Sequence, residues 1–442
     1  MTGEDSALTR SLVDWIAARE DRLVDLLREM IRTRSVNPGL DPGSAGEGAM
    51  AELVRSRYAA LGIPVETVEA APGRPNLIAR WEGTGGGPRL LVNCHLDTQP
   101  ADLGEWLDPF TGAVVHEWTR DAFGGDLDGG VVFGRGAADH KSPIAATLFA
   151  LEALRAHGVR PRGTLTCIHD ADEETGGRLG MRHLAACLPF DYDMALYACT
   201  SEVTERGQAF FPPMGASNVV RAFAGGQTYR VRVAGLNLHS LTPASGLGAA
   251  EAALLLLDQL RPLLQRVNEE PSEGEAGGHP RMRISGIDSG PRAALHHQAR
   301  TCEITINRRL PPGTDPEAAV AELQAVVDAH CRAHPENPAE LEVLRSLPPF
   351  TVAPDHPLVE DLVRAVRAVT GEEPAVVGVP ASVGISELLV RHLIPTVLFG
   401  YGILNLHHAI DEHIAVAALR RTAQVYAVAF VEWLAVASAG IG

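Results

Sequence analysis

The chain has 442 residues, of which 45% are hydrophobic and 21% charged, a composition typical of a soluble globular enzyme and not of a disordered protein. At this length two or three domains are expected. Lysine and arginine total 38 against 55 aspartates and glutamates, a formal net charge of −17. This balance excludes the basic surface by which proteins bind nucleic acids or anionic membranes.

The cysteines and the two ends of the chain predict a cytoplasmic protein. Six cysteines are scattered without a C-x-x-C pair, which favours buried free thiols in a reducing compartment. The first five residues lack an apolar segment, so no secretory signal is predicted. The apolar segment 425–442 contains Glu432 and continues a helical pattern. We therefore expect a terminal helix that faces the core, and no membrane span.

Strands and helices alternate in the first half of the chain. Apolar residues recur at helical spacing within residues 12–30. The elements expected next are a helix at 48–61, strands at 64–68, 76–81 and 89–93, a helix at 141–157, a strand at 164–169, a helix at about 177–187 and a strand at 194–199. This alternation predicts an α/β sheet domain with mostly parallel strands.

A different pattern occupies the middle of the chain. Residues 210–226 are rich in Pro, Gly and aromatic side chains and are predicted to form a linker. The elements expected after it are a strand at 227–233, a helix at 248–264, a polar loop at 268–280, strands at 281–287 and 302–307, and a helix at 315–334. The α/β pattern returns with a helix at 357–369, a strand at 395–399 and a helix at 414–434. We predict a catalytic domain made of residues 1–215 and 336–442, interrupted by an α+β domain at 216–335.

Histidine and carboxylate side chains follow several expected strands. The apolar strand at 89–93 leads into His95-Leu-Asp97. Because ligands in open α/β sheets gather at the carboxyl ends of strands, His95 could bind a metal while Asp97 holds its other ring nitrogen. A turn without any function would explain this short motif as well. The motif is therefore evidence for a metal site only in combination with other motifs.

Two acidic motifs come next along the chain. Asp139 precedes the helix expected at 141–157, where it could cap the helix or bind a cation. Residues 170–174 contain four carboxylates, which repel one another unless a cation or a raised pKa relieves them. The adjacent Glu173 and Glu174 suit a division of tasks, with one as a metal ligand and the other as a general base.

The last two motifs complete an ordered series. Glu202 follows the strand at 194–199, and His407-His408-Ala-Ile-Asp-Glu follows the strand at 395–399. The whole series resembles the two-metal deacylases and exopeptidases that include acetylornithine deacetylase, succinyl-diaminopimelate desuccinylase, aminoacylase and glutamate carboxypeptidase. The resemblance covers nearly the whole chain. It implies a zinc-aminopeptidase-like α/β catalytic domain with an inserted ferredoxin-like lid, through which the protein dimerises.

The resemblance also implies a role for each motif residue. Glu173 is then the general base, Asp97 supports the first histidine, and Asp139 bridges both metals. The five implied metal ligands are His95, Asp139, Glu174, Glu202 and His408. Two histidines and three carboxylates suit Zn²⁺, with Co²⁺ or Mn²⁺ as alternatives.

Three lid residues have implied roles as well. By the resemblance, His239 reaches into the partner subunit's site and helps to hold the oxyanion. Arg308 and Arg309 lie in a segment similar to the D-R-R-x-x-P segment of the family's lid, where a guanidinium can bind a substrate carboxylate. Adjacent residues of a strand point to opposite faces, so at most one of these arginines faces the site.

The segments that contact substrate in the family differ here, so no substrate is carried over. Tyr401 stands where the family has proline, and residues 295–298 lack its Asn-x-x-Pro. We expect a dinuclear metal-dependent hydrolase of the amide bond of an N-acyl amino acid or similar small molecule. The alternatives are a di- or exopeptidase, removal of an amine or carbamoyl group from an unusual small molecule, and a non-catalytic binding protein on this fold.

Overall fold

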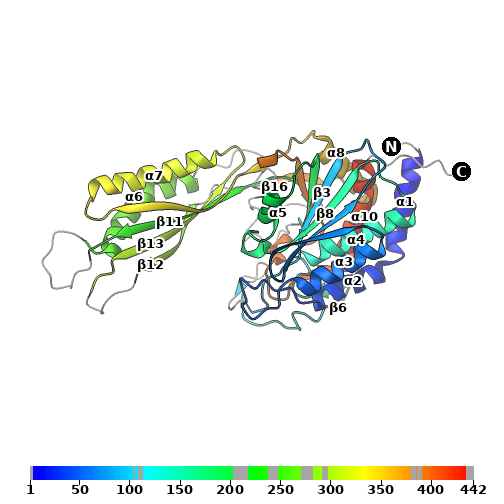
Figure 1. The fold of residues 1–442 in the computed structure, drawn as a ribbon, viewed down its shortest axis with the longest axis horizontal. Helices are drawn as coiled ribbons and strands as arrows, with labels where there is room; N and C mark the ends of the chain where they lie inside the picture. The colour runs from blue at the N-terminus through cyan, green and yellow to red at the C-terminus, as the bar shows by residue number, and fades with distance from the viewer. Residues whose placement is uncertain are drawn as a thin grey trace. The chain divides into compact units, whose positions relative to one another are not determined.

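A computed structural model gives the fold of the chain (Figure 1). It describes residues 3–102, 104, 106–107, 113–202, 218–236, 247–269, 282–290, 297–379, 385 and 391–434. The chain divides into two compact units. The first comprises Met1–Arg221, Val352–Val377 and Arg391–Gly442, and the second comprises Ala222–Thr351 and Gly378–Val390.

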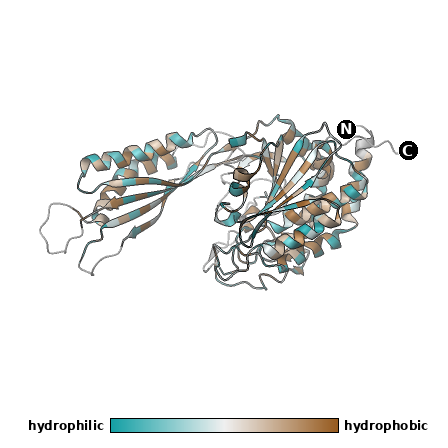
Figure 2. Ribbon diagram, in the orientation of Figure 1, coloured by the Kyte–Doolittle hydropathy of each residue, from teal (hydrophilic) through white to brown (hydrophobic). Residues whose placement is uncertain are grey.

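A large mixed sheet has the strand order β1-β2-β8-β3-β9-β17-β10-β15, with β16 also paired to β10. Its strands are β1 (Val65–Ala71), β2 (Arg74–Trp81), β3 (Arg89–His95), β8 (Thr164–Asp170), β9 (Met194–Ala198), β10 (Asn218–Phe223), β15 (Phe350–Thr351), β16 (Ala375–Val379) and β17 (Thr396–Phe399). The strands β8, β3, β9 and β17 pair in parallel. Figure 2 shows these central strands as mainly apolar, and every residue of β3 after the first is buried. The expected parallel core is therefore confirmed.

Helices and short strands complete the first unit. They are α1 (Gly3–Ala17), α2 (Glu20–Arg32), α3 (Gly48–Ala60), α4 (Lys141–Ala156), α5 (Met181–Cys187), α8 (Pro357–Thr370) and α10 (Val416–Trp433), the 3₁₀ turns η1 (Glu173–Thr175) and η2 (Leu404–Leu406), and the strands β4 (Trp106–Leu107), β5 (Val114–Val115), β6 (Asp126–Asp128), β7 (Val131–Phe133) and β18 (His413–Ala415). The helix α10, most of whose residues are buried, packs against α1, α4 and α8. Among the described helices, none combines the length and the apolar character needed to cross a membrane.

The second unit is a four-stranded antiparallel sheet with two helices. Its elements are β11 (Gly225–Ala234), α6 (Ala249–Glu269), β12 (Met282–Ser289), β13 (Thr301–Leu310), α7 (Pro316–Ala333) and β14 (Ala339–Leu347), and the strand order is β12-β13-β11-β14. The chain order βαββαβ is that of the ferredoxin-like fold. Alternate residues of β11, including Tyr229 and Val231, form one core with Leu256 of α6 and Leu323 of α7. The predicted fold class is confirmed.

Two expectations about this region are wrong. The segment 210–226 was expected to be a linker, but from Asn218 onward it forms β10 and the start of β11. Its apolar residues, such as Val219 and Val220, are fully buried in the sheet. The inserted domain also extends past residue 335, because β14 pairs with β11 and belongs to the second unit. Ala339, Leu341 and Val343 of β14 alternate with two glutamates, a short strand pattern that the predicted domain boundary overlooked.

Candidate metal centre

The parallel strands bring the motifs to one edge of the sheet. β3 ends at His95, β8 at Asp170, β9 at Ala198 and β17 at Phe399. Because these four strands run in the same direction, their carboxyl ends and the loops that follow them lie together. This edge is where open α/β sheets bind ligands.

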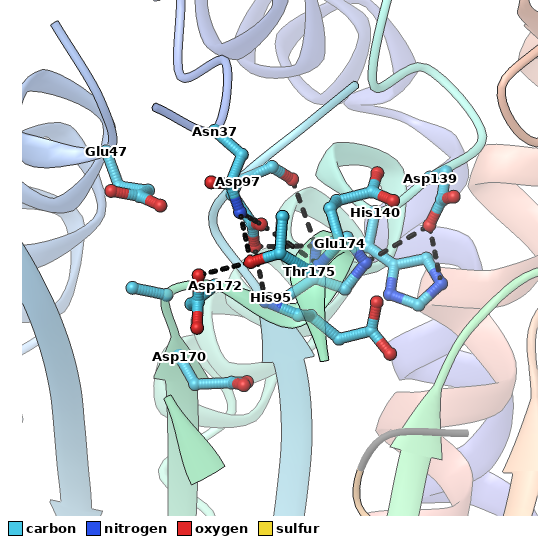
Figure 3. A network of polar contacts seen from close by, with 12 residues as sticks. Asn37, Glu47, His95, Asp97, Asp139, His140, Asp170, Asp172, Glu174 and Thr175 are labelled. Atoms are coloured by element: carbon cyan, nitrogen blue, oxygen red, sulfur yellow. Dashed lines mark hydrogen bonds and ion pairs between the residues drawn. The ribbon is translucent and has the colours of Figure 1, made fainter. Parts of the chain in front are cut away.

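Asp139 stands between the two expected metal positions. Its Oδ1 lies 3.1 Å from Nε2 of His95, and both residues are buried (Figure 3). Its Oδ2 lies 3.1 Å from Nε2 of His408, and Oε2 of Glu174 lies 3.0 Å from the same nitrogen. A carboxylate that faces one donor group with each oxygen is suited to bridge two cations, the role expected for Asp139.

Asp97 positions two neighbouring parts of the centre. Its main-chain oxygen lies 2.9 Å from Nδ1 of His95, which leaves Nε2 of that ring for a metal. Its carboxylate accepts hydrogen bonds from the main-chain N–H groups of Glu173 and Glu174, each at 3.1 Å. Asn37 donates to the same carboxylate at 2.6 Å. Asp97 thus orients the imidazole and fixes the turn that carries both glutamates.

A buried ion-pair network stabilises the start of that turn. Asp172 has a φ of 69°, a conformation that residues other than glycine seldom adopt. Its carboxylate accepts the main-chain N–H of Leu179 at 3.0 Å and lies 3.2 Å from the guanidinium of Arg74. Arg74 also forms a two-pronged pair with the buried Glu47. These contacts hold Asp172 in its unusual conformation.

Glu412 holds the loop that presents Asp139. Its fully buried carboxylate accepts hydrogen bonds from the main-chain N–H groups of Gly136, Ala138 and Asp139 at 3.1, 2.7 and 2.9 Å. It also pairs at 2.9 Å with the buried guanidinium of Arg135. Glu412 ends the last sequence motif, which predicts no role for it. Its partners are main-chain N–H groups, which every residue except proline has. The sequence therefore contains no pattern of side chains that would predict this role.

The charges of the centre favour a cation. Burial raises the pKa of Glu173 and of Glu174 above the usual value of a glutamate. Burial alone would lower the pKa of His408, but its hydrogen bonds with Asp139 and Glu174 outweigh this effect and raise the pKa to about 11. A positive charge is therefore stabilised between these two carboxylates.

The donor atoms fit two divalent cations. Those of Asp139, Glu174 and His408 lie within 4.8 Å of one another, and so do those of His95, Asp139 and His140. The buried Oε1 of Glu174 has no hydrogen-bond partner among the described residues. Imidazole and carboxylate donors at these spacings suit Zn²⁺, and also Co²⁺ or Mn²⁺.

Three donors in the centre were missed from the sequence. His140, Cys199 and His407 form a further group whose donor atoms lie within 4.8 Å of one another. His140 follows Asp139 directly, Cys199 is the first residue after β9, and His407 precedes His408. Their positions in the sequence could have identified them, because each residue adjoins an expected ligand or the end of an expected strand.

Glu202 lies outside all three donor groups found among the described residues. Its Oε2 accepts a hydrogen bond from the main-chain N–H of Gly402 at 3.0 Å. Burial raises the pKa of Glu202 to about 7. The distances among the described residues therefore do not support its predicted place in the metal centre. The motif comparison placed the ligand three residues beyond the first residue after β9.

The predicted lid residues have different outcomes. His239 lies outside the described residues. Arg308 is buried in the second unit, where its guanidinium lies 2.7 Å from Glu322 and donates at 3.1 Å to the main-chain oxygen of Ala319. Arg309 is on the opposite, exposed side of β13. Arg308 thus stabilises its own unit, and Arg309 remains the predicted substrate-binding arginine.

A comparison with family models identifies the chain. Residues 91–432 match the model of peptidase family M20/M25/M40. The chain belongs to this family. It is therefore a hydrolase of C–N bonds that depends on bound metal, as the sequence predicted.

Related proteins of the M20 family match over nearly the whole chain. Acetylornithine deacetylase of Vibrio vulnificus is 27% identical over 401 residues, covering 89% of this chain and 93% of that protein. The dipeptidase Dug1p of Saccharomyces cerevisiae has a similar fold, with a TM-score of 0.73 at 15% identity over 97% of this chain and 98% of that one. The YXEP protein of Bacillus subtilis, described as a dinuclear metal-binding peptidase, has a TM-score of 0.65 at 15% identity over 95% and 100% of the two chains.

Proposed function

We propose that this M20 hydrolase removes the acyl group from an N-acyl amino acid or a similar small molecule. The supporting observation is the position of Asp139 between His95 and the pair Glu174–His408, with Glu173 on the same turn as Glu174. The similarity to acetylornithine deacetylase favours an acyl amide as the substrate.

The chain's own residues divide the chemical work. When bound, two metal ions polarise the substrate carbonyl and lower the pKa of water. Glu173 takes the proton from the attacking water and passes it to the leaving nitrogen, so that the amide C–N bond breaks to a carboxylate and an amine. Burial raises the pKa of Glu173, which brings it closer to the value that suits a base near neutral pH. Asp97 holds the backbone of Glu173 in place.

The resident metal is proposed to be zinc. The imidazole and carboxylate donors support this choice, with Co²⁺ or Mn²⁺ as active substitutes. We also propose that the protein acts in the cytoplasm, which its six free cysteines support. A homodimer formed through the second unit completes the proposal.

Dipeptide hydrolysis is the second candidate function. The fold similarity to the dipeptidase Dug1p favours it, and both reactions break an amide bond by the same chemistry. The segments that differ from the family, at Tyr401 and at residues 295–298, favour neither of these two substrate classes.

A substrate screen with metal removal tests the function. Purified protein loaded with zinc is assayed against N-acetyl, N-formyl and N-succinyl amino acids and against dipeptides. We expect one acyl class to be hydrolysed, activity to disappear after chelation, and zinc to restore it. Hydrolysis that chelation leaves unchanged would refute the metal chemistry, and a clear preference for dipeptides would establish the second candidate.

A further inference from the structure

A group of nitrogen and sulfur donors lies beside Asp139. His140, Cys199 and His407 come from three separate segments, yet their donor atoms lie within 4.8 Å of one another. Nε2 of His140 lies 2.9 Å from Sγ of Cys199, and both side chains are almost fully buried. The same His140 nitrogen lies 3.1 Å from Oδ1 of Asp139. The group is therefore continuous with the first-metal side of the centre.

We infer that Cys199, together with His140 and His407, supplies the remaining ligands of the first metal, and that Glu202 does not bind metal. This inference rests on the proposed two-metal hydrolase and names donors of its own site. The ligands of the first metal are then mainly imidazoles and a thiolate, whereas the sequence predicted mainly carboxylates.

Contacts around the group support a ligand role. The polar neighbours of the His140 ring lie at Nε2, the nitrogen that faces Cys199 and Asp139. Nε2 of His407 lies 2.6 Å from the hydroxyl of Thr200. Its Nδ1 lies 3.4 Å from Oδ2 of Asp139. Metal-binding histidines usually have their second nitrogen fixed in this way.

Contacts around Glu202 assign that residue another task. Its main-chain N–H donates to the oxygen of Gly402 at 2.9 Å, and its main-chain oxygen accepts from Leu404 at 2.8 Å. Its carboxylate accepts from Gly402. Glu202 thus holds the segment that leads to His407. The first residue after β9 is Cys199, which is the position where a strand-end ligand is expected.

The two metal positions then differ in softness. Thiolate selects soft or borderline ions such as Zn²⁺, whereas the carboxylates of Asp139 and Glu174 also accept Mn²⁺. Zinc should fill both positions. Manganese should bind less tightly at the first position than at the position of Glu174 and His408.

Cobalt spectroscopy tests the thiolate directly, without relying on activity. The full-length protein is stripped of metal and loaded with two equivalents of Co²⁺. We expect a near-ultraviolet charge-transfer band from sulfur to cobalt, which Cys199→Ser removes. Cys187→Ser is the matched control, because Cys187 is exposed and lies outside the donor groups. The band should persist in that control and in Glu202→Gln.

Zinc binding gives the quantitative result. Loss of an outer partner alone weakens metal binding about 10–100-fold, so loss of the Cys199 ligand should weaken one of two zinc ions by more than about 100-fold. Glu202→Gln should retain both ions. The inference is overturned if Glu202→Gln loses an ion while Cys199→Ser keeps two.

X-ray absorption on the unmodified protein covers the case in which Cys199→Ser does not fold. With two zinc ions bound, we expect one sulfur neighbour at about 2.3 Å for each pair of ions. Two bound ions with only nitrogen and oxygen neighbours would refute the thiolate ligand and leave the proposed hydrolase intact. Failure to bind any metal would instead refute the proposed function.

Discussion

At the residue scale, Glu173 and Glu174 are adjacent and yet differ in their surroundings. Oε2 of Glu174 lies 3.0 Å from His408 and accepts a hydrogen bond from Gln99 at 2.8 Å. Glu173 belongs to none of the three donor groups found among the described residues. The backbone of each residue is held by Asp97, so replacing one side chain should leave the turn in place.

The two glutamates can therefore be separated by substitution. Glu173→Gln should bind two metals and lose about 10²–10⁴-fold in kcat, because a neutral amide cannot take the proton from water. Glu174→Gln should instead lose one metal, because an amide is a weaker ligand than a carboxylate. Elemental analysis and kcat on the same preparations check both results. Near-normal turnover of Glu173→Gln on its best substrate would refute the assignment of the base.

At the element scale, one buried carboxylate organises the loop between β7 and α4. Glu412→Gln leaves Arg135 buried without its opposite charge and exchanges an acceptor for a donor beside the main-chain N–H groups of that loop. Breaking a buried pair from one side typically costs about 3–5 kcal/mol, so we expect a loss of that size in the free energy of unfolding. Denaturant titration measures it.

The control for this prediction is a pair on the surface. Glu52 forms an exposed pair with Arg55 on α3. Glu52→Gln should leave the free energy of unfolding nearly unchanged, because solvent screens an exposed pair. Equal effects of the two substitutions would show that Glu412 is not the main support of the loop.

A buried lysine joins α4 to the end of α2 and makes stability depend on pH. Nζ of Lys141 donates hydrogen bonds to the main-chain oxygens of Met30 and Thr33 at 2.9 and 2.8 Å. Burial lowers its pKa from 10.5 to about 7. Between these two values the unfolded chain holds a proton that the folded chain lacks, so this group makes stability rise with pH across that window.

Comparison with Lys141→Met isolates this effect. The difference in unfolding free energy, wild type minus Lys141→Met, should increase between pH 7 and pH 9, whereas below pH 7 it should be nearly constant. Urea unfolding at several pH values measures the difference. A difference that does not vary with pH would show that Lys141 stays protonated in the folded protein.

Helices and strands with strong apolar patterns could be predicted from the sequence. Strands that are recognised mainly by pairing with a neighbouring strand could not. β3, β8 and α4 are mostly buried and are built around apolar residues, and each was expected within about two residues of its observed bounds. The strand β14 is mostly exposed and has only a short alternating pattern, so its pairing with β11 identifies it more clearly than its sequence. The same limit applies to the site. His95 and Asp139 followed from their positions after a strand and before a helix, whereas Cys199 could be separated from Glu202 only by distances.

At the scale of the whole molecule, we propose that the second unit joins two copies of the chain. Its edge strands within the described residues are β12 and β14. Ile287 on β12 and Val343 and Leu344 on β14 expose large apolar side chains. Exposed strand edges with apolar residues are surfaces on which another chain can add. Size-exclusion chromatography with light scattering should therefore show a dimer.

The family resemblance further predicts that the two copies share their active sites, with His239 of one copy serving the centre of the other. Removing an oxyanion donor costs about 10²–10³-fold in kcat, so His239→Ala should lose that much activity and keep its metals. The decisive experiment mixes the two impaired variants, Glu173→Gln and His239→Ala, after subunit exchange has been verified with differently tagged chains. A mixed dimer then contains one site with both Glu173 and His239 intact, and activity should rise well above that of either variant. If activity after exchange stays at the average of the two variants, His239 acts within its own chain or not at all, while the metal chemistry at Asp139 is unaffected by that result.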